Sequence, residues 1–362
     1  MTQAAEETEA WLRLGLIPQL GPATLRKLLA EFGDPESAIA ASKAALSRSV
    51  GEALADAIAR GPDSARLDAS LGWLQQPGHR LLTMADADYP PHLLEIADPP
   101  PVLFLNGNGA LLRNRQAIAI VGSRHATRQG EANAEAFARD LADRGFTIIS
   151  GLATGVDAAA HRGGLLGQGS SIAVVGTGLD IVYPARNREL AHALADSGLL
   201  VSEFAIGTKP FSGNFPRRNR LLSGLARGVL VVEGALQSGS LITARHAIDQ
   251  GREVFAIPGS IHSPQSKGCH LLIRQGAKLV ECAADILEEL GQETGVRASQ
   301  PTPDIQPKHA GLIEALGYDP VDLDSICERS GLTPENASAM LLELELEGHV
   351  ARAPGGKFQR MR

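Results

Sequence analysis

A cluster of basic and aromatic side chains occupies residues 208–220, which read Thr-Lys-Pro-Phe-Ser-Gly-Asn-Phe-Pro-Arg-Arg-Asn-Arg. An arginine guanidinium is planar and matches phosphate oxygens, and an aromatic ring gives a nucleobase a face on which to stack. The cluster predicts a binding site for a phosphodiester strand. The simpler alternative is a solvated charged loop anchored by two buried phenylalanines. The candidate residues are Lys209, Phe211, Phe215, Arg217, Arg218, Asn219 and Arg220.

Small and polar residues follow the apolar runs that we expect to be strands. Glycine lets a ligand approach the backbone, and the helix N-termini that follow such turns favour anions. Any one of these turns is also explained by the structural need for glycines and helix caps, so the prediction rests on the set. We expect an anion-binding crevice formed by Gly122, Ser123, Arg124, Ser238, Gly239, Ser240 and Lys267.

Few residues are candidates for catalysis. Asp157 and His161 are four residues apart on a predicted helix and therefore share one face. They could form an acid–base pair or bind a metal ion, but such a pair more often holds a helix to its sheet by hydrogen bonds. No third ligand or nucleophile is suitably spaced, and Glu233 is the other candidate, at a strand end. We expect no catalytic site and no metal site.

The sequence also lacks the common cofactor motifs. No GxxxxGK[ST] segment is present, which excludes a P-loop NTPase. Residues 176–178 begin a GxGxxG pattern, but Ile181 occupies the position of its last glycine. The three cysteines form no CxxC pair, so neither a zinc site nor a disulfide framework is expected. We expect no cofactor.

Alternating strands and helices must position these side chains. Continuous apolar strands that alternate with helices are typical of a doubly wound, mostly parallel, Rossmann-like α/β sheet, whose ligands bind beyond the carboxyl ends of the strands. Val102–Leu105 is expected to be a short strand, and the prolines at 90, 91 and 99–101 to prevent regular structure. The strands are expected at 117–124, 147–151, 171–178, 199–204, 228–235, 253–260 and 278–282, and the helices at 128–144, 155–167, 186–197, 218–227, 239–250 and 268–275.

Four units are expected along the chain. Residues 1–80 form a small helical module, in which Leu14–Gly33 resembles a helix–hairpin–helix of the kind found in SAM-like domains or simply packs as helices. Residues 81–290 are expected to form an extended Rossmann-like domain. Residues 291–307 are polar and contain prolines, which is typical of a linker. Residues 308–362 form a winged helix, with three helices and a hairpin around Gly355-Gly356.

Charge is unevenly distributed along the chain. The net charge is −7, yet residues 106–275 contain 18 Lys and Arg and 12 Asp and Glu, a net charge of +6. This favours an anionic partner for the middle segment. The winged helix contains 6 basic and 9 acidic residues, which favours a protein contact rather than a DNA groove. An acidic N-terminus and the lack of an 18-residue apolar run lead us to expect a cytoplasmic protein without a membrane contact.

Many blocks of the sequence resemble one known family. They occur, in the order of the DNA-processing protein A family (DprA/Smf), between residues 85 and 285, and the N-terminal helical module and the winged helix resemble those of its longer members. The blocks are IVGSR (120–124), SGLATGVDAAAH (150–161), AVVGTGLDIVYP (173–184), SEF (202–204), FPRRNRLLSGLARGVLVVEG (215–234), SGSLITARHA (238–247) and AIPGS (256–260).

The resemblance implies a recombination mediator rather than an enzyme. Members of the family bind single-stranded DNA, form homodimers through the Rossmann-like domain, and load a RecA-type recombinase during natural transformation. If the family's binding residues are transferred to the matching positions of this sequence, Arg124 and the arginines at 217, 218 and 220 would hold phosphates, with help from Lys209. A stacking aromatic is expected in the same loop region, either Phe211 or Phe215.

Two other functions remain as alternatives. One is a nucleotide enzyme similar to phosphoribohydrolases, whose PGGxGTxxE block is missing here apart from the fragment at 258–260. The other is an interaction scaffold in which the winged helix does the main work.

Overall fold

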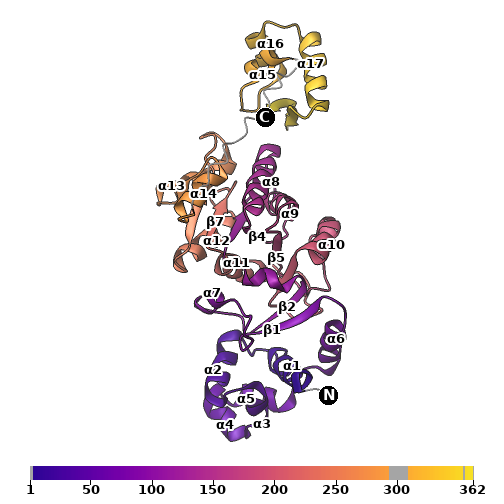
Figure 1. The fold of residues 1–362 in the computed structure, drawn as a ribbon, viewed down its shortest axis with the longest axis vertical. Helices are drawn as coiled ribbons and strands as arrows, with labels where there is room; N and C mark the ends of the chain where they lie inside the picture. Colours follow the sequence, from indigo (N-terminus) through magenta and orange to yellow (C-terminus); the bar gives the residue numbers. More distant parts are fainter. Residues whose placement is uncertain (1–2, 293–308, 354, 362) are drawn as a thin grey trace.

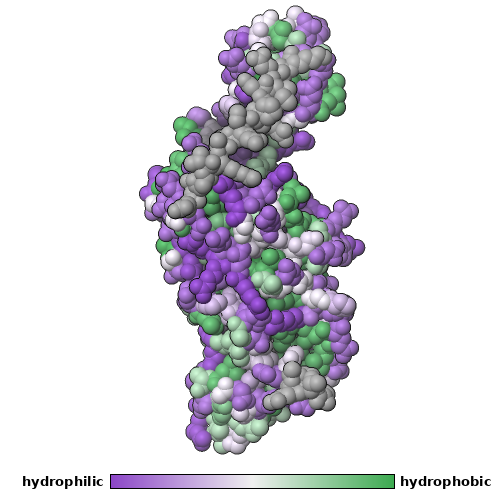
Figure 2. Space-filling model, viewed as in Figure 1, coloured by the Kyte–Doolittle hydropathy of each residue, from purple (hydrophilic) through white to green (hydrophobic). Residues whose placement is uncertain are grey.

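The computed structural model describes residues 3–292, 309–353 and 355–361. The expected linker, 291–307, lies almost entirely outside the described residues. Figure 2 shows that the face of the molecule turned to the viewer is hydrophilic across its middle, with apolar side chains scattered around it. No described helix has the length and apolar character that crossing a membrane would take.

A nine-stranded sheet forms the centre of the molecule (Figure 1). Its strand order is β1-β2-β6-β5-β4-β3-β7-β8-β9. In this order, the last seven strands, from β6 through β3 to β9, are parallel to one another. Strand β2 pairs antiparallel with both β1 and β6. The predicted mostly parallel α/β sheet is therefore confirmed. The strands are β1 (His79–Thr83), β2 (Val102–Gly107), β3 (Ala117–Val121), β4 (Thr147–Ser150), β5 (Ser171–Val174), β6 (Leu199–Ser202), β7 (Gly228–Val231), β8 (Glu253–Ala256) and β9 (Lys278–Leu279).

Helices cover both faces of this sheet, as a doubly wound fold requires. In β3, Ala117, Ala119 and Val121 pack toward one face, and Ile118 and Ile120 toward the other. Because both faces are buried, the strand is apolar throughout rather than alternating. The first face carries α7 (Pro91–Leu94), α11 (Asn214–Gly224), α12 (Gly239–Asp249) and α13 (Lys267–Arg274), and the second carries α8 (Arg128–Asp143), α9 (Val156–Leu166), α10 (Arg188–Ser197) and α14 (Ala283–Glu289).

The strand order reverses between β3 and β7. The chain builds β3 to β6 outward in one direction and then returns to add β7 on the other side of β3. The loops after β3 and β7 consequently leave the sheet toward opposite faces, which opens a crevice at its carboxyl edge. Residues 121–125 after β3 and residues 237–240 after β7 meet at this crevice.

The N-terminal helices pack around a small core of their own, formed by leucines, isoleucines and alanines of α1–α5. Pro22 occupies the first turn of α2, as its fixed φ angle favours. Trp11 and Leu12 of α1 instead pack with α6 against β1 and β2. The helices are α1 (Gln3–Gly15), α2 (Pro22–Phe32), α3 (Pro35–Ala40), α4 (Lys43–Val50), α5 (Glu52–Arg60) and α6 (Ser64–Leu74).

Two expectations for the entry to the sheet need correction. The antiparallel strand β1 was not expected. It includes residue 80, at which the helical module was expected to end. The prolines were expected to prevent regular structure, yet Pro91 begins the short helix α7. Proline lacks an N–H that the first turn of a helix does not need, so it starts a helix without cost.

The C-terminal unit is a winged helix, as predicted. Its core brings together Leu312, Ile326 and Leu341, one from each of its helices, with Val350 of the hairpin. Thr333 caps the last helix by accepting a hydrogen bond from the Asn336 N–H at 3.4 Å. The elements are α15 (Ala310–Leu316), α16 (Leu323–Ser330), α17 (Pro334–Leu346), β10 (Val350–Ala353) and β11 (Lys357–Arg360).

Candidate functional site

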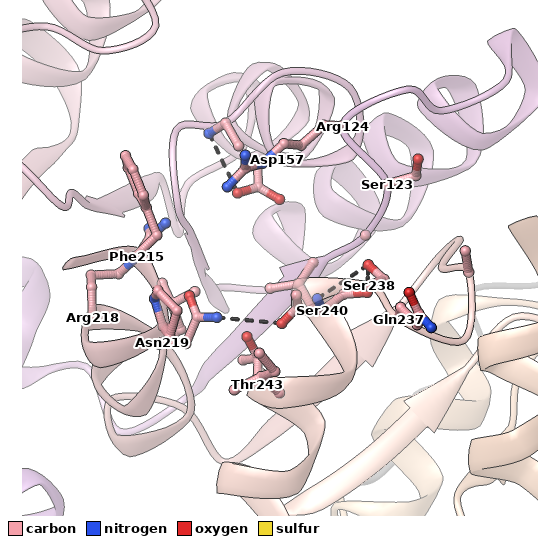
Figure 3. A pocket seen from close by; sticks show the side chains of 18 of the residues that line it. Ser123, Arg124, Asp157, Phe215, Arg218, Asn219, Gln237, Ser238, Ser240 and Thr243 are labelled. Carbon is pink, nitrogen blue, oxygen red and sulfur yellow. Dashed lines mark hydrogen bonds between the residues drawn. The ribbon is translucent and has the colours of Figure 1, made fainter. Parts of the chain in front are cut away.

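A pocket of about 730 Å³ lies at the carboxyl edge of the sheet. Loops that follow six parallel strands, β3 to β8, contribute to its lining, so residues from distant parts of the sequence meet there. In Figure 3, side chains of α11 stand on one side of the pocket, those of the β7–α12 loop stand opposite, and Arg124 and Asp157 complete a third wall. The polar and aromatic lining residues are Ser123, Arg124, His125, Asp157, Tyr183, Ser212, Phe215, Arg218, Asn219, Gln237, Ser238, Ser240, Thr243 and Gln265.

The turn after β3 contributes the first of the predicted groups. Gly122 is needed for close packing, since a Cβ there would come within 2.6 Å of the Val156 side chain. The Ser123 hydroxyl accepts a hydrogen bond from the His125 N–H at 3.1 Å, which fixes the turn. Arg124 is exposed, and Thr154 Oγ1 donates to its carbonyl oxygen at 2.8 Å. The turn thus places an exposed arginine in the lining of the pocket.

An aromatic wall lies beside this guanidinium. The Arg124 guanidinium carbon is 5.6 Å from the centre of the Phe215 ring, within cation–π distance. The Tyr183 ring is tilted by 35° against the Phe215 ring, with the two ring centres 5.6 Å apart, and Tyr183 is 45% exposed. Tyr183 was not among the expected site residues, although it lies in the block 173–184.

The structure separates the two candidate phenylalanines. Phe215 is half-buried and lines the pocket. Phe211 is 67% exposed and lies over Gly213, outside the lining residues. Phe215 therefore has the position expected of a stacking aromatic, and Phe211 does not.

The arginine cluster is a helix rather than a flanking loop, which corrects the expected start of helix 218–227. α11 begins at Asn214, so its arginines point in different directions.

Arg218 is 4% exposed and forms the floor of the pocket, where it donates a hydrogen bond to the Val174 carbonyl. Burial lowers the pKa of Arg218 to about 10, an effect that the nearby Asp157 carboxylate opposes. A Cβ on Gly151 would overlap this guanidinium, which explains the glycine after β4.

Arg220 is buried and points away from the pocket. Its Nη2 lies 2.6 Å from Glu203 Oε2 and 3.4 Å from Asp98 Oδ2. The expected phosphate contact of Arg220 stays a prediction, which these two carboxylates and the place of Arg220 outside the pocket lining do not favour. Burial raises the pKa of Glu203, and Arg220 and Arg217 counteract that effect.

Three other expected basic residues lie outside the pocket lining. Arg217 is half-exposed, with its Nη2 3.2 Å from Glu203 Oε2 and its guanidinium 5.5 Å from the Phe204 ring centre. Lys209 is exposed on the β6–α11 loop, and Lys267 is exposed at the start of α13. The predicted residues that line the pocket are Gly122, Ser123, Arg124, Phe215, Arg218, Asn219, Ser238, Gly239 and Ser240.

The start of α12 forms the wall opposite α11. Ser238 caps the helix by accepting a hydrogen bond from the Ser240 N–H at 3.3 Å, and the two hydroxyl oxygens are 2.7 Å apart. Asn219 Nδ2 donates to the Gly239 carbonyl at 3.3 Å and so connects the two walls. The N–H groups of the first helical turn favour an anion. Gln237 and Thr243 also line this wall and were not predicted.

Asp157 and His161 hold α9 to the loop after β4, as the structural interpretation of their spacing predicted. Asp157 Oδ2 accepts hydrogen bonds from the N–H groups of Gly151 at 3.1 Å and Ala153 at 3.4 Å. His161 Nε2 accepts one from the Leu152 N–H at 3.2 Å, so its proton is on Nδ1, which is 2.8 Å from Ser171 Oγ. Burial lowers the pKa of His161 to about 3, which keeps the ring neutral.

Glu233 is similarly occupied. Its carboxylate accepts hydrogen bonds from the Thr127 N–H at 3.0 Å and the Thr127 hydroxyl at 2.6 Å, at the start of α8. Burial raises the pKa of Glu233. Within residues 3–292, 309–353 and 355–361, no group of three His, Cys, Asp or Glu is placed to hold a metal ion.

Comparison with known proteins decides which family this architecture represents. A family model described as DNA recombination-mediator protein A matches residues 80–291, more than half of the chain. The chain belongs to this family. The matched range of the DNA recombination-mediator protein A family contains the whole sheet except the first residue of β1, together with all residues that line the pocket. A second model, the DprA winged helix domain, matches residues 296–356.

Individual members of the family resemble the chain over most of its length. The protein Smf of Escherichia coli strain K12 is 44% identical over 307 residues, which are 82% of this chain and 81% of that protein. The X-ray structure of DNA processing protein A from Streptococcus pneumoniae superimposes with a TM-score of 0.69 at 36% identity, and covers 80% of this chain and 99% of that one. A Helicobacter pylori DNA processing protein A, described for its unique single-stranded DNA binding mode, has a TM-score of 0.54 at 30% identity and covers 58% of this chain and 95% of that one.

Proposed function

We propose that this protein binds single-stranded DNA in the carboxyl-edge pocket and acts as a recombination mediator. The observation that carries the proposal is the wall formed by Arg124, Phe215 and Tyr183, which faces the start of α12 across the pocket. A base can stack on the aromatic rings while its phosphate meets the guanidinium or the α12 N–H groups. Binding of single-stranded DNA by the Helicobacter relative supports this.

The pocket favours a single strand over a duplex. In a duplex the bases are stacked on each other, so their faces are not available to Phe215 and Tyr183. Stacking on bases and contacts with phosphates do not depend on the base sequence. This suits a protein that must accept any incoming strand. Family membership also supports a role in DNA recombination and processing.

We also propose that the protein is a binding protein and not an enzyme. Asp157, His161 and Glu233 are the candidate acids and bases, and each uses its polar atoms to hold neighbouring backbone or hydroxyl groups. A general acid or base needs a polar atom that reaches substrate. Incubation of the protein with nucleoside monophosphates should release no free base, and release that is lost in Glu233→Ala would support the enzyme alternative instead.

The partners follow from the same proposal. A mediator hands its strand to a RecA-type recombinase, and we propose this partner together with a homodimer formed through the Rossmann-like domain, in the cytoplasm. Among the described residues, β9 is the outermost strand of the sheet. Leu279 on β9 and Ile261 in the loop after β8 are large exposed apolar side chains. The exposed glutamates of α17 make the winged helix a protein-contact unit in this proposal.

The test is fluorescence anisotropy with labelled oligo-dT and a duplex of the same length. We expect single-strand preference and an affinity that falls steeply with salt, with a slope of about −0.7 per neutralised phosphate. Arg124→Ala should weaken binding and flatten this slope, whereas Arg128→Ala, an exposed arginine on α8 outside the pocket, should not. Equal affinity for the duplex, or no dependence on salt, would contradict the proposal.

A further inference from the structure

A second hollow lies where the α1–α2 turn faces the β6–α11 loop. Its volume is about 400 Å³, and it lies on the other side of the first turn of α11 from the carboxyl-edge pocket. We call it the hairpin groove. One wall is formed by Gly15–Pro22 of the α1–α2 turn, and the other by Glu203–Ala205, Thr208, Asn214 and Arg217, with Arg66 and Pro100–Val102 at its ends.

Apolar and polar groups both line the hairpin groove, and two arginines lie at its edge. Leu16, Ile17, Leu20 and Phe204 are among its apolar residues, although most of their surface is buried. A mixed lining of this kind suits a nucleotide, because a base contacts apolar surface and its phosphate needs a cation. A segment of acidic protein would require more cations than the rim provides, and a lipid headgroup would require an exposed apolar face beside it.

Two arginines from different parts of the sequence form the basic rim. Arg66 extends from α6 to the β6–α11 loop, where its Nη2 donates to Thr208 Oγ1 at 3.0 Å. Arg217 lies on α11 across the groove from the α1–α2 turn. A guanidinium has five N–H donors, and both side chains are exposed or half-exposed, so each retains donors that a phosphate can use.

The hairpin groove continues the carboxyl-edge pocket. Successive residues of one segment line the two hollows in turn: Pro210, Ser212, Phe215 and Pro216 face the pocket, whereas Thr208, Asn214 and Arg217 face the groove. A strand that leaves the pocket over the first turn of α11 therefore enters the groove directly. Arg217, which the pocket itself does not use, lies at the crossing.

We infer that the hairpin groove binds the nucleotides that follow those in the carboxyl-edge pocket, with Arg66 and Arg217 on their phosphates and the α1–α2 turn as a wall. This inference rests on the proposed function, since it concerns the same strand. It gives the helix–hairpin–helix resemblance of Leu14–Gly33 a definite role. Residues 1–80 contain 8 Lys and Arg and 10 Asp and Glu, so the effect must come from Arg66 locally and not from a general positive charge.

The experiment measures the affinity of the full chain for oligo-dT of about five and about twenty nucleotides, lengths that fill the pocket alone or extend beyond it. The variants are Arg66→Ala and the isosteric Gln19→Glu, which adds a negative charge to an exposed residue of the groove wall. Arg60→Ala is the matched control, an exposed arginine of α5 in the same module but outside the groove.

We expect Arg66→Ala to weaken binding of the long oligonucleotide about fivefold and to reduce its salt slope by about 0.7. Gln19→Glu should act in the same direction, and binding of the short oligonucleotide should not change in either variant. Unchanged binding of the long oligonucleotide would overturn the inference while the proposed function stands. Equal weakening of both lengths would also overturn it, because Arg66 would then act on the pocket through Thr208. If the wild-type chain binds neither length, the proposed function itself fails.

Discussion

The guanidinium of Arg124 lies 5.6 Å from the centre of the Phe215 ring, although 90 residues separate them in the sequence. Arg124 comes from the loop after β3 and Phe215 from the first turn of α11, which follows β6, and the parallel sheet brings both to the same edge. A cation held over an aromatic face lowers the freedom of both groups. The pair therefore presents a stacking face and a phosphate donor already in place before a strand arrives.

Of the two candidate phenylalanines, only Phe215 should weaken DNA binding when it is replaced. Phe215→Ala removes the face on which a base would stack, a loss of about 1–3 kcal/mol or roughly five- to a hundredfold in affinity for oligo-dT. Phe211→Ala is the control, because Phe211 is exposed and lies outside the pocket. Anisotropy titrations of both variants measure the difference. Equal losses would mean that the loop, rather than the ring at 215, determines binding.

Protonation of His161 should destabilise the fold as pH falls. The folded pKa is about 3 and the ordinary value is 6.5, so the unfolded chain binds the extra proton first. This contribution to stability is complete above pH 6.5 and declines as pH falls toward 3, by up to about 1.4 kcal/mol per pH unit.

His161→Gln tests this expectation, because it removes the titrating ring and leaves the other acids and histidines in place. Urea unfolding should show the variant as less stable than the wild-type chain at pH 7, with a difference that shrinks toward pH 5. A difference that stays constant over this range would show that the ring does not titrate on unfolding.

Loss of the buried ion pair should affect stability more than binding. Arg220→Ala leaves the Glu203 carboxylate buried without its closest cation, which costs about 3–5 kcal/mol for a pair of this kind. The double variant Arg220→Met with Glu203→Gln removes both charges and should recover much of that loss. Urea unfolding measures stability, and the affinity for the short oligo-dT, which fills the carboxyl-edge pocket alone, should remain close to wild type in the double variant. A large loss of affinity there would give Arg220 a role in binding after all.

The proposed dimer face can be tested with a charge placed on it. Ile261→Glu and Leu279→Glu introduce carboxylates where apolar side chains would be buried between subunits, and sedimentation should show a shift from dimer to monomer. Leu166→Glu is the control, because Leu166 is 62% exposed, close to the 66% of Ile261, but lies at the end of α9, between β4 and β5 in the chain. A monomeric wild-type chain, or dissociation by the control alone, would contradict this face.

The sheet and the place of the pocket were predictable from the sequence. Apolar runs such as Ala117–Val121 have no alternation, which only a strand buried on both faces requires. The small residues that end those runs marked the carboxyl edge. The expected strands extended past the observed ends by up to four residues, because the apolar run continues into the turn, as at Val232.

The direction of the arginines was not predictable in the same way. Three arginines in four residues suggested one phosphate-binding surface, and the helix was expected to begin only at residue 218. In the structure Pro216 lies within the first turn of α11, where its missing N–H is not needed. The helix therefore carries Arg217, Arg218 and Arg220 to three different surroundings. Only tertiary packing decides which of them remains free.

This arrangement fixes the rotational phase of α11. One additional residue ahead of Arg217 would turn the following side chains by about 100°. The guanidinium of Arg218 would then leave the pocket floor, and the arginine that took the place of Arg218 or Arg220 would be buried away from its partner. The loop between β6 and α11 can accept insertions, since its residues are largely exposed. The first turn of α11 cannot, so related chains should vary in length before Asn214 and remain in register after it.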